Sequence, residues 1–252
     1  ACACFGMAPL NDDIIFWGVL SGIIHGVYIL CLSRAYSTAD LSYVYPIARS
    51  APIFVPVFAW LLLDEQLSIS IFFAIVLILL AIFILHFEGK VIQGFKNLIG
   101  AFGHQDLRWA FYTLAMVVSY SLVDKKGMDS FLNHLPDQPF ANGITYFFIE
   151  ATIGFALCNV YVFASHPAKY IFQTWRSEWK KAMLAGTATL GSYGLIWVVL
   201  QFEALSAIVS LRQVSVLMVV YWGCWRLKEP FGPQRLLAGV LILIGVILIG
   251  SP

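Results

Sequence analysis

Charged residues are scarce in this chain. They make up 12% of its 252 residues, while hydrophobic residues make up 60%. A soluble domain has about 25% charged residues, so this composition excludes an ordinary soluble domain and indicates a polytopic membrane protein. The net charge of +1 gives no indication of an acidic or nucleic-acid partner.

Cysteines with metal-binding or redox spacing are also missing. The five cysteines are scattered, and three lie in apolar runs, so we interpret them as small packing residues. The chain lacks Gly-x-Ser-x-Gly, His-Glu-x-x-His, paired intramembrane aspartates and a phosphate-cradling loop, which disfavours an intramembrane enzyme. We therefore expect no catalytic residue, no metal and no cofactor.

The chain begins ACACFGMAPLNDD, without an initiator methionine or a basic segment before a short apolar one. We expect no signal peptide and a start inside a longer protein.

Eight apolar runs approach the length of about 20 residues that crosses a bilayer. They cover roughly residues 13–32, 41–63, 69–87, 107–123, 141–163, 182–201, 205–225 and 236–250. The loop at 164–181 contains YIFQTWRSEWKK, a mixture of aromatic and basic residues that is typical of a segment at the lipid headgroups. Loops on one side hold eleven lysines and arginines, and the other side holds Lys125 and Lys126. The positive-inside rule then predicts that both chain ends face outward.

The run LSYVYPIARSAPIFVPVFAWLLLDE combines three prolines, Pro46, Pro52 and Pro56, with an internal arginine, Arg49. Proline inside a helix removes a backbone donor and kinks the axis. An intramembrane arginine costs at least about 2.5–3.5 kcal/mol, so it normally faces the bundle interior. We expect this helix to line a path through the membrane.

A similar order of features occurs twice. Glu65 follows Arg49 by 16 positions, Glu229 follows Arg212 by 17, and each glutamate precedes a very apolar helix. The two units lie five helices apart, and an odd offset gives them opposite orientations. This is the inverted repeat that secondary transporters use.

The two arginines predict a substrate site near the membrane midplane. With a rise of 1.5 Å per residue, Arg49 lies roughly 12 Å inside the cytoplasmic end of its helix, and Arg212 lies at a similar depth from the outer end. A guanidinium binds carboxylate or phosphonate in bidentate fashion, which favours an anionic or zwitterionic solute. The alternative is that each arginine is a structural lock near a kink or an internal acid.

Glu150 is the only acid well inside a predicted span, and three roles remain open for it. It is a counter-charge for an arginine, a proton-coupling group or a neutral packed acid. The remaining candidates for substrate binding are aromatic or polar residues, several at helical spacing, for which core packing is the alternative. They are His25, Tyr28, Tyr45, Tyr193 and Trp197. For Tyr45 an interfacial anchor is a further alternative.

Other features are interpreted structurally. Asp124 is expected to end a helix at the surface, and Glu65 and Glu229 are expected to be solvated or helix-start carboxylates. Glycines of the final run, Gly239 and Gly245 among them, suit close helix packing within one subunit, with a homodimer as the alternative.

Several stretches resemble a known transporter family. SGIIHGVYILCLSRAYSTADLSYVYPIARSAPIF is similar to the first half of bacterial EamA-like members of the drug/metabolite transporter superfamily, where a His-x-x-Tyr helix leads to a D-L-S-x-V-Y-P-x-A-R segment. YSLVDKKG and ALSAIVSLRQVSVLMVVYWGCWRLKEP are similar to the closing helices of that family. The resemblance implies a ten-helix carrier of two inverted five-helix units in a bacterial inner membrane.

On this reading, residues 1–100 are a partial first repeat with three helices, whose first two helices are absent, and residues 101–252 are a second repeat with five. The leading hypothesis is a secondary transporter that moves a small polar metabolite by alternating access. A non-transporting helical scaffold or sensor is the alternative, and an intramembrane enzyme is less favoured. The expected partners are the lipid bilayer and a small solute.

Overall fold

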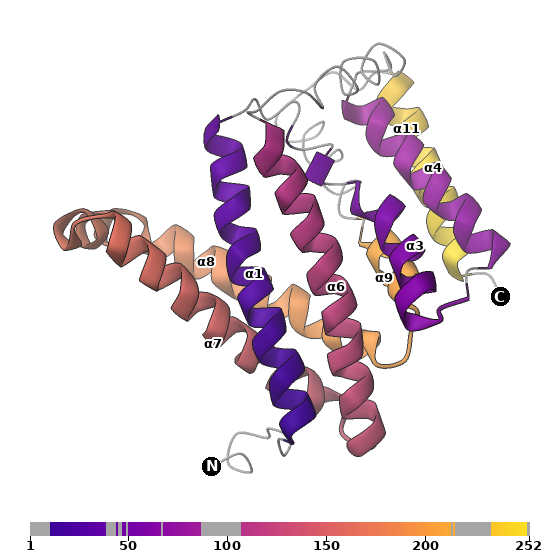
Figure 1. Ribbon diagram of the computed structural model, residues 1–252. Helices are drawn as coiled ribbons and strands as arrows, with labels where there is room; N and C mark the ends of the chain where they lie inside the picture. Colours follow the sequence, from indigo (N-terminus) through magenta and orange to yellow (C-terminus); the bar gives the residue numbers. More distant parts are fainter. Residues whose placement is uncertain are drawn as a thin grey trace. The chain divides into compact units, whose positions relative to one another are not determined.

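The computed structural model describes residues 11–38, 44, 47–48, 50–66, 68–86, 107–212, 214 and 233–250. These parts of the chain form eight α-helices and no β-strand (Figure 1), which confirms the all-helical prediction. The helices are α1 (Asp12–Thr38), α3 (Ala51–Leu63), α4 (Ile69–His86), α6 (Arg108–His134), α7 (Pro139–Ser165), α8 (Ala168–Leu200), α9 (Leu205–Leu211) and α11 (Pro233–Gly250).

Three helices of the described residues are long and apolar enough to cross a membrane. They are α1, α7 and α8. Two shorter apolar helical stretches, Ala51–Leu63 and Ile69–Ala81, correspond to further predicted spans. The described helices therefore support the membrane assignment, while the inverted repeat stays a prediction.

Three helices are longer than predicted. The predicted end of the α6 run at residue 123 is wrong, because the helix continues to His134. Met128 and Phe131 are fully buried beyond Asp124, so the packed face of the helix continues through this charged stretch. Likewise, α1 continues past the predicted end at residue 32 to Thr38, and α8 begins at Ala168 instead of residue 182.

The chain divides into two compact units. Unit 1 contains Ala1–Leu30 and Ser119–Glu203, and unit 2 contains Cys31–Val118 and Ala204–Pro252. Unit 1 therefore holds most of α1, the second half of α6, and all of α7 and α8. The helices α3, α4, α9 and α11 belong to unit 2.

Close packing of α1 against α7 in unit 1 depends on glycine. A Cβ atom built at Gly22 would lie 2.6 Å from Ile153 Cβ and 2.7 Å from the carbonyl oxygen of Glu150. From the other helix, a Cβ at Gly154 would lie 3.2 Å from the carbonyl oxygen of Gly22. Small residues allow two helix backbones to approach closely, as they do in membrane helix pairs. The two helices thus meet backbone to backbone beside the polar residues described below.

In unit 2, α11 packs on α4 around Ala81, Ala238 and Ile242, which are all completely buried. A Cβ at Gly245 would lie 2.7 Å from Ile78 Cγ1, so Gly245 packs within the subunit, as predicted. Nearby, Glu65 Oε2 accepts a hydrogen bond from the Ser206 backbone N–H, at 3.3 Å. Glu65 is therefore a carboxylate at a helix start, and that helix is α9.

Candidate functional site

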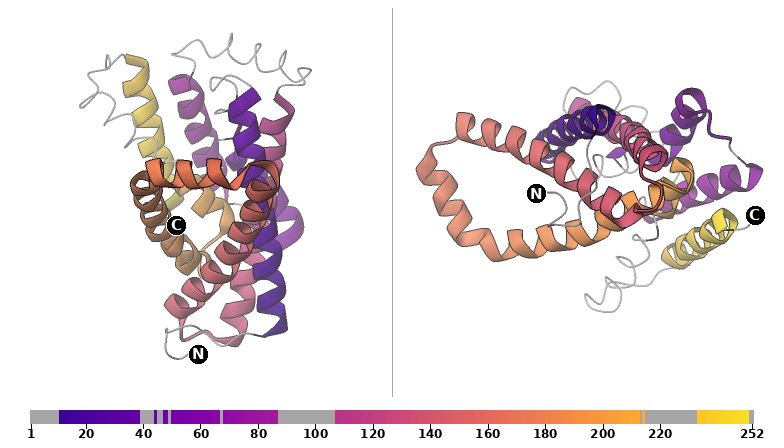
Figure 2. Two further views of the ribbon diagram at one scale, coloured as in Figure 1. Left: turned by 90° about the vertical axis from the view of Figure 1, so that its left-hand side faces the viewer. Right: turned by 90° about the horizontal axis from the view of Figure 1, so that it is seen from below.

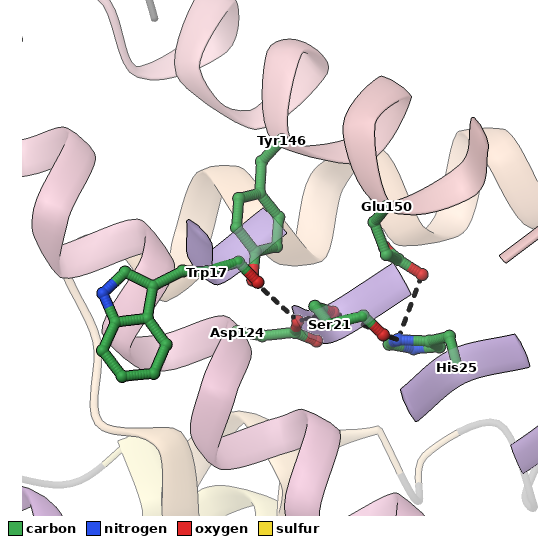
Figure 3. Close-up of polar contacts among 6 residues, drawn as sticks. All are labelled: Trp17, Ser21, His25, Asp124, Tyr146 and Glu150. Carbon is green, nitrogen blue, oxygen red and sulfur yellow. Dashed lines mark hydrogen bonds and ion pairs between the residues drawn. The ribbon is translucent and has the colours of Figure 1, made fainter. Parts of the chain in front are cut away.

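Five polar side chains from three helices meet in the interior of unit 1. They form the polar cluster, which consists of Ser21, His25, Asp124, Tyr146 and Glu150 (Figure 3). Each of the five is at most 8% exposed. Because α1 and α7 are apolar enough to cross a membrane, burial of these groups there is costly unless they bond to one another.

Ser21 and His25 lie one turn apart on α1 and reach two different helices. Ser21 Oγ donates a hydrogen bond to Asp124 Oδ1 on α6, at 2.5 Å. His25 Nδ1 lies 3.2 Å from Ser21 Oγ and 3.1 Å from Glu150 Oε1 on α7. Since the serine proton is used by Asp124, we assign a proton to His25 Nδ1, which then donates toward Glu150 and the serine oxygen.

Asp124 lies inside α6 and is 6% exposed, so its predicted position at a helix end on the surface is wrong. Its Oδ1 accepts a hydrogen bond from the Tyr146 hydroxyl, at 3.1 Å, in addition to the one from Ser21. The Trp17 carbonyl oxygen lies 3.4 Å from the same hydroxyl as a second acceptor. Two hydroxyl donors therefore compensate for the burial of this carboxyl group.

Glu150 contacts an imidazole, and the two groups form an ion pair when that imidazole is protonated. The pair joins Oε1 to His25 Nδ1, while Oε2 is buried and has no hydrogen-bond partner among the described residues. Among the residues that the structure describes, no lysine or arginine forms an ion pair with Glu150. The carboxylate thus retains one acceptor oxygen that a further donor can occupy.

The nearest lysine in sequence is used elsewhere. Lys125 Nζ donates to the carbonyl oxygens of Leu200 at 2.9 Å and Glu203 at 3.3 Å, and it pairs with Asp129 at 3.0 Å. A cation bonded to the last carbonyls of a helix satisfies acceptors that lack intrahelical donors. Lys125 therefore ties α6 to the end of α8, and its predicted position in an outer loop is wrong.

Aromatic rings enclose the cluster on two sides. The Tyr120 ring stacks on His25 with centroids 3.9 Å apart, and the half-buried Tyr28 meets His25 edge-on at 6.4 Å. On the α8 side, Trp197 is 1% exposed and lies 6.2 Å from Tyr146, measured between ring centroids. The Trp197 ring also contacts Tyr193, at 5.6 Å. His25, Tyr28, Tyr193 and Trp197 thus all belong to unit 1, and their role in substrate binding stays a prediction.

The predicted arginine site is only partly described. Arg212 is half-buried in unit 2, where it follows the last residue of α9 and donates its backbone N–H to Ile208. Arg49 and Tyr45 lie outside the described residues, as does Glu229. The pairing of the two arginines therefore stays a prediction.

The N-terminal part of the chain, which supplies Ser21 and His25, matches a known family. The model of the EamA-like transporter family, within the drug/metabolite transporter superfamily, covers residues 2–87. These residues are similar to that family, and we call them the EamA-like segment. Members of this family are membrane transporters rather than enzymes, and together with the apolar helices the match indicates an integral membrane protein. No curated protein matches the chain.

The EamA-like segment holds only two residues of the polar cluster, and the other three follow it in sequence. Ser21 and Tyr146 were not predicted from the sequence, and neither was the burial of Asp124. The sequence does contain one signal for the two missed residues, which is their spacing from predicted ones. Ser21 precedes His25 by four positions, and Tyr146 precedes Glu150 by four. Residues four apart share a helix face, so each missed residue lies beside a predicted one.

Three members of the cluster have side chains that can bind and release a proton. The cluster contains two carboxyl groups and one imidazole, with hydroxyl donors directed at Asp124. The described parts of the chain contain no group of three or more histidines, cysteines or acids that could hold a metal ion.

Proposed function

We propose that this protein is a secondary transporter that moves a small anionic or zwitterionic metabolite by alternating access, and that His25 and Glu150 exchange the coupling proton. The observation that carries the proposal is the 3.1 Å contact between His25 Nδ1 and Glu150 Oε1, two titratable groups buried between helices that are apolar enough to cross a membrane. The EamA-like segment supports transport as the activity. The proposal places the protein in a bacterial inner membrane.

The free-energy cost of placing charged residues inside a spanning helix favours transport over a purely structural scaffold. Insertion scales assign about 2.5–3.5 kcal/mol to a charged residue at the centre of a spanning helix, and such residues usually mark ion or proton pathways. Close packing of α1 on α7 already follows from Gly22 and Gly154, without help from a charged pair. A scaffold therefore has no need for His25 and Glu150, whereas a coupled transporter needs a buried group that changes its charge.

The contacts of the polar cluster support a path for the proton. Glu150 Oε2 accepts no hydrogen bond from the described residues, so a proton can bind there without displacing a donor. From Oε1 the bonded series continues through His25 and Ser21 to Asp124. Loading or unloading one proton changes the charge of the cluster, and that change can bias the protein between two conformations.

Two transport measurements, solute exchange and proton-driven accumulation, test the role of Glu150. The protein is reconstituted in liposomes and screened with amino acids and small carboxylates, first for exchange across the membrane and then for accumulation driven by a pH gradient. Glu150→Gln is expected to keep solute exchange and to lose accumulation, because exchange needs no net movement of the coupling proton. The control is Glu203→Gln, which changes an exposed glutamate of the same unit and should leave both modes intact.

The outcomes separate the alternatives. Loss of both modes in Glu150→Gln, with the fold retained, would assign Glu150 to the ammonium group of a zwitterionic substrate instead. Accumulation that persists in this variant would reject proton coupling at Glu150. If no solute moves in either mode, the transporter proposal itself fails.

A further inference from the structure

The helix α8 is longer than a membrane crossing requires. Its 33 residues correspond to roughly 50 Å at 1.5 Å per residue, whereas the hydrocarbon core is about 30 Å thick. Every charged residue of α8 lies between Ala168 and Lys181, and residues 182–200 contain none. The first part of α8 therefore has the composition of a segment at the headgroups, and the remainder has that of a membrane-crossing part.

Two neighbouring rows of side chains run along this first part of α8. At 100° per residue, Phe172, Trp175, Trp179 and Met183 form one stripe along the helix, and these four side chains are 46–67% exposed. Lys169, Arg176 and Lys180 form an adjacent row, which is also exposed. We name these two sets the aromatic stripe and the basic row.

Such an arrangement is typical of a helix that lies in the membrane interface, with its apolar face at the acyl boundary and its cations toward the headgroups. Figure 2 shows that α8 curves along its length, so its first part follows a different direction from its second part within unit 1. A curved helix allows an interfacial first part to continue into a spanning second part.

The basic row is free of competing acids. Glu178, the only acid of this part of α8, lies on the opposite side of the helix from the basic row and pairs with Lys181 at 2.8 Å. Lys180 lies 5.8 Å from the centre of the Trp179 ring, a position that links the basic row to the aromatic stripe. Among the described residues, Lys169, Arg176 and Lys180 form no ion pair.

We propose that the basic row binds the phosphate groups of anionic phospholipids, while the aromatic stripe inserts at the boundary between headgroups and acyl chains. The surface is complementary to an anionic headgroup layer, because three cations without ion pairs among the described residues lie beside exposed tryptophans. A zwitterionic headgroup also carries a positive group and gains less from this row. The occupant is therefore an anionic lipid rather than bilayer lipid in general.

Lipid binding by the full chain tests this assignment. The purified protein in neutral detergent is titrated with phosphatidylglycerol or phosphatidylcholine, and the bound lipids are counted by native mass spectrometry. Wild type should prefer phosphatidylglycerol. The variant Lys169→Gln/Arg176→Gln/Lys180→Gln should lose at least tenfold in this preference, since each surface cation contributes about fivefold to binding an anionic membrane.

The matched control is Lys181→Gln, which removes one positive charge from the same helix but from the lysine already paired with Glu178. It should keep the preference of wild type. Circular dichroism checks that the variants stay folded, which the exposure of all four side chains favours. Equal preference in wild type and the triple variant, or an equal loss in the triple variant and the control, would overturn the proposal.

Discussion

Substitution of Gly22 by alanine should test how the packing of α1 on α7 supports the polar cluster. A new Cβ would lie 2.6 Å from Ile153 Cβ and 2.7 Å from the backbone oxygen of Glu150. Carbon atoms in contact are normally about 3.5–4.0 Å apart, so the helices must separate by roughly 1 Å. The obstructing atoms belong to a side-chain root and a backbone, which cannot turn away.

The separation should also weaken the ion pair. His25 Nδ1 lies 3.1 Å from Glu150 Oε1. An added separation of about 1 Å would place these atoms beyond the usual hydrogen-bond range of about 2.7–3.2 Å. Overpacking costs about 1–3 kcal/mol, and loss of the hydrogen bond adds about 1 kcal/mol. Gly22→Ala should therefore lower the free energy of unfolding by about 2–4 kcal/mol.

The assay is reversible unfolding by sodium dodecyl sulfate, followed by circular dichroism, in a double-mutant cycle with Glu150→Gln. If Gly22 holds the ion pair together, Glu150→Gln should cost less in the Gly22→Ala background than in wild type. Independent substitutions would instead add within about 0.3–0.5 kcal/mol. An additive result, or an unchanged free energy of unfolding in Gly22→Ala, would refute the argument.

Gly186→Ala is the matched control, because a Cβ there would meet no atom within 4 Å. Alanine is favoured over glycine inside a helix by roughly 0.5–1 kcal/mol. This variant should therefore be as stable as wild type or slightly more stable. A loss similar to that of Gly22→Ala would show that the assay responds to any added methyl group.

Three further predictions concern the surroundings of the cluster and use the same unfolding assay. Tyr146→Phe removes one of the two hydroxyl donors to Asp124 and should cost about 1 kcal/mol, and an unchanged stability would show that water replaces the hydroxyl. Lys125→Met removes the donor to the last carbonyls of α8 and should also cost about 1 kcal/mol, whereas Lys126→Met, at an exposed position, should not. Trp197→Ala empties a fully buried site and should cost about 3–5 kcal/mol, and a loss below about 1 kcal/mol would contradict its role as core.

Helix positions were predicted well where the helix ends close to the ends of its apolar run. The predicted runs at 69–87 and 141–163 agree with α4 and α7 to within two residues at each end. Prediction failed for α6 and α8, where charged residues continue a helix beyond its apolar part. Hydropathy indicates which part of a helix suits lipid, whereas hydrogen bonding and packing decide where the helix ends.

The functional residues show a similar division. Glu150 stood out because an acid is rare inside an apolar run, and His25 because of its place in the EamA-like motif. Neither signal indicated that the two residues are partners. Nothing in the sequence indicated that Asp124 is buried, since a carboxylate followed by two lysines is typical of a protein surface.

The sequence by itself therefore determined the class of this protein and the helices that carry polar groups, because hydropathy and helical spacing are local properties of the chain. Only the tertiary structure decided which polar groups meet. That outcome depends on the rotation and separation of α1, α6 and α7, which are controlled by contacts between residues far apart in sequence. At Gly22 and Gly154 the absence of a side chain allows α1 and α7 to approach, and His25 reaches Glu150 as a result.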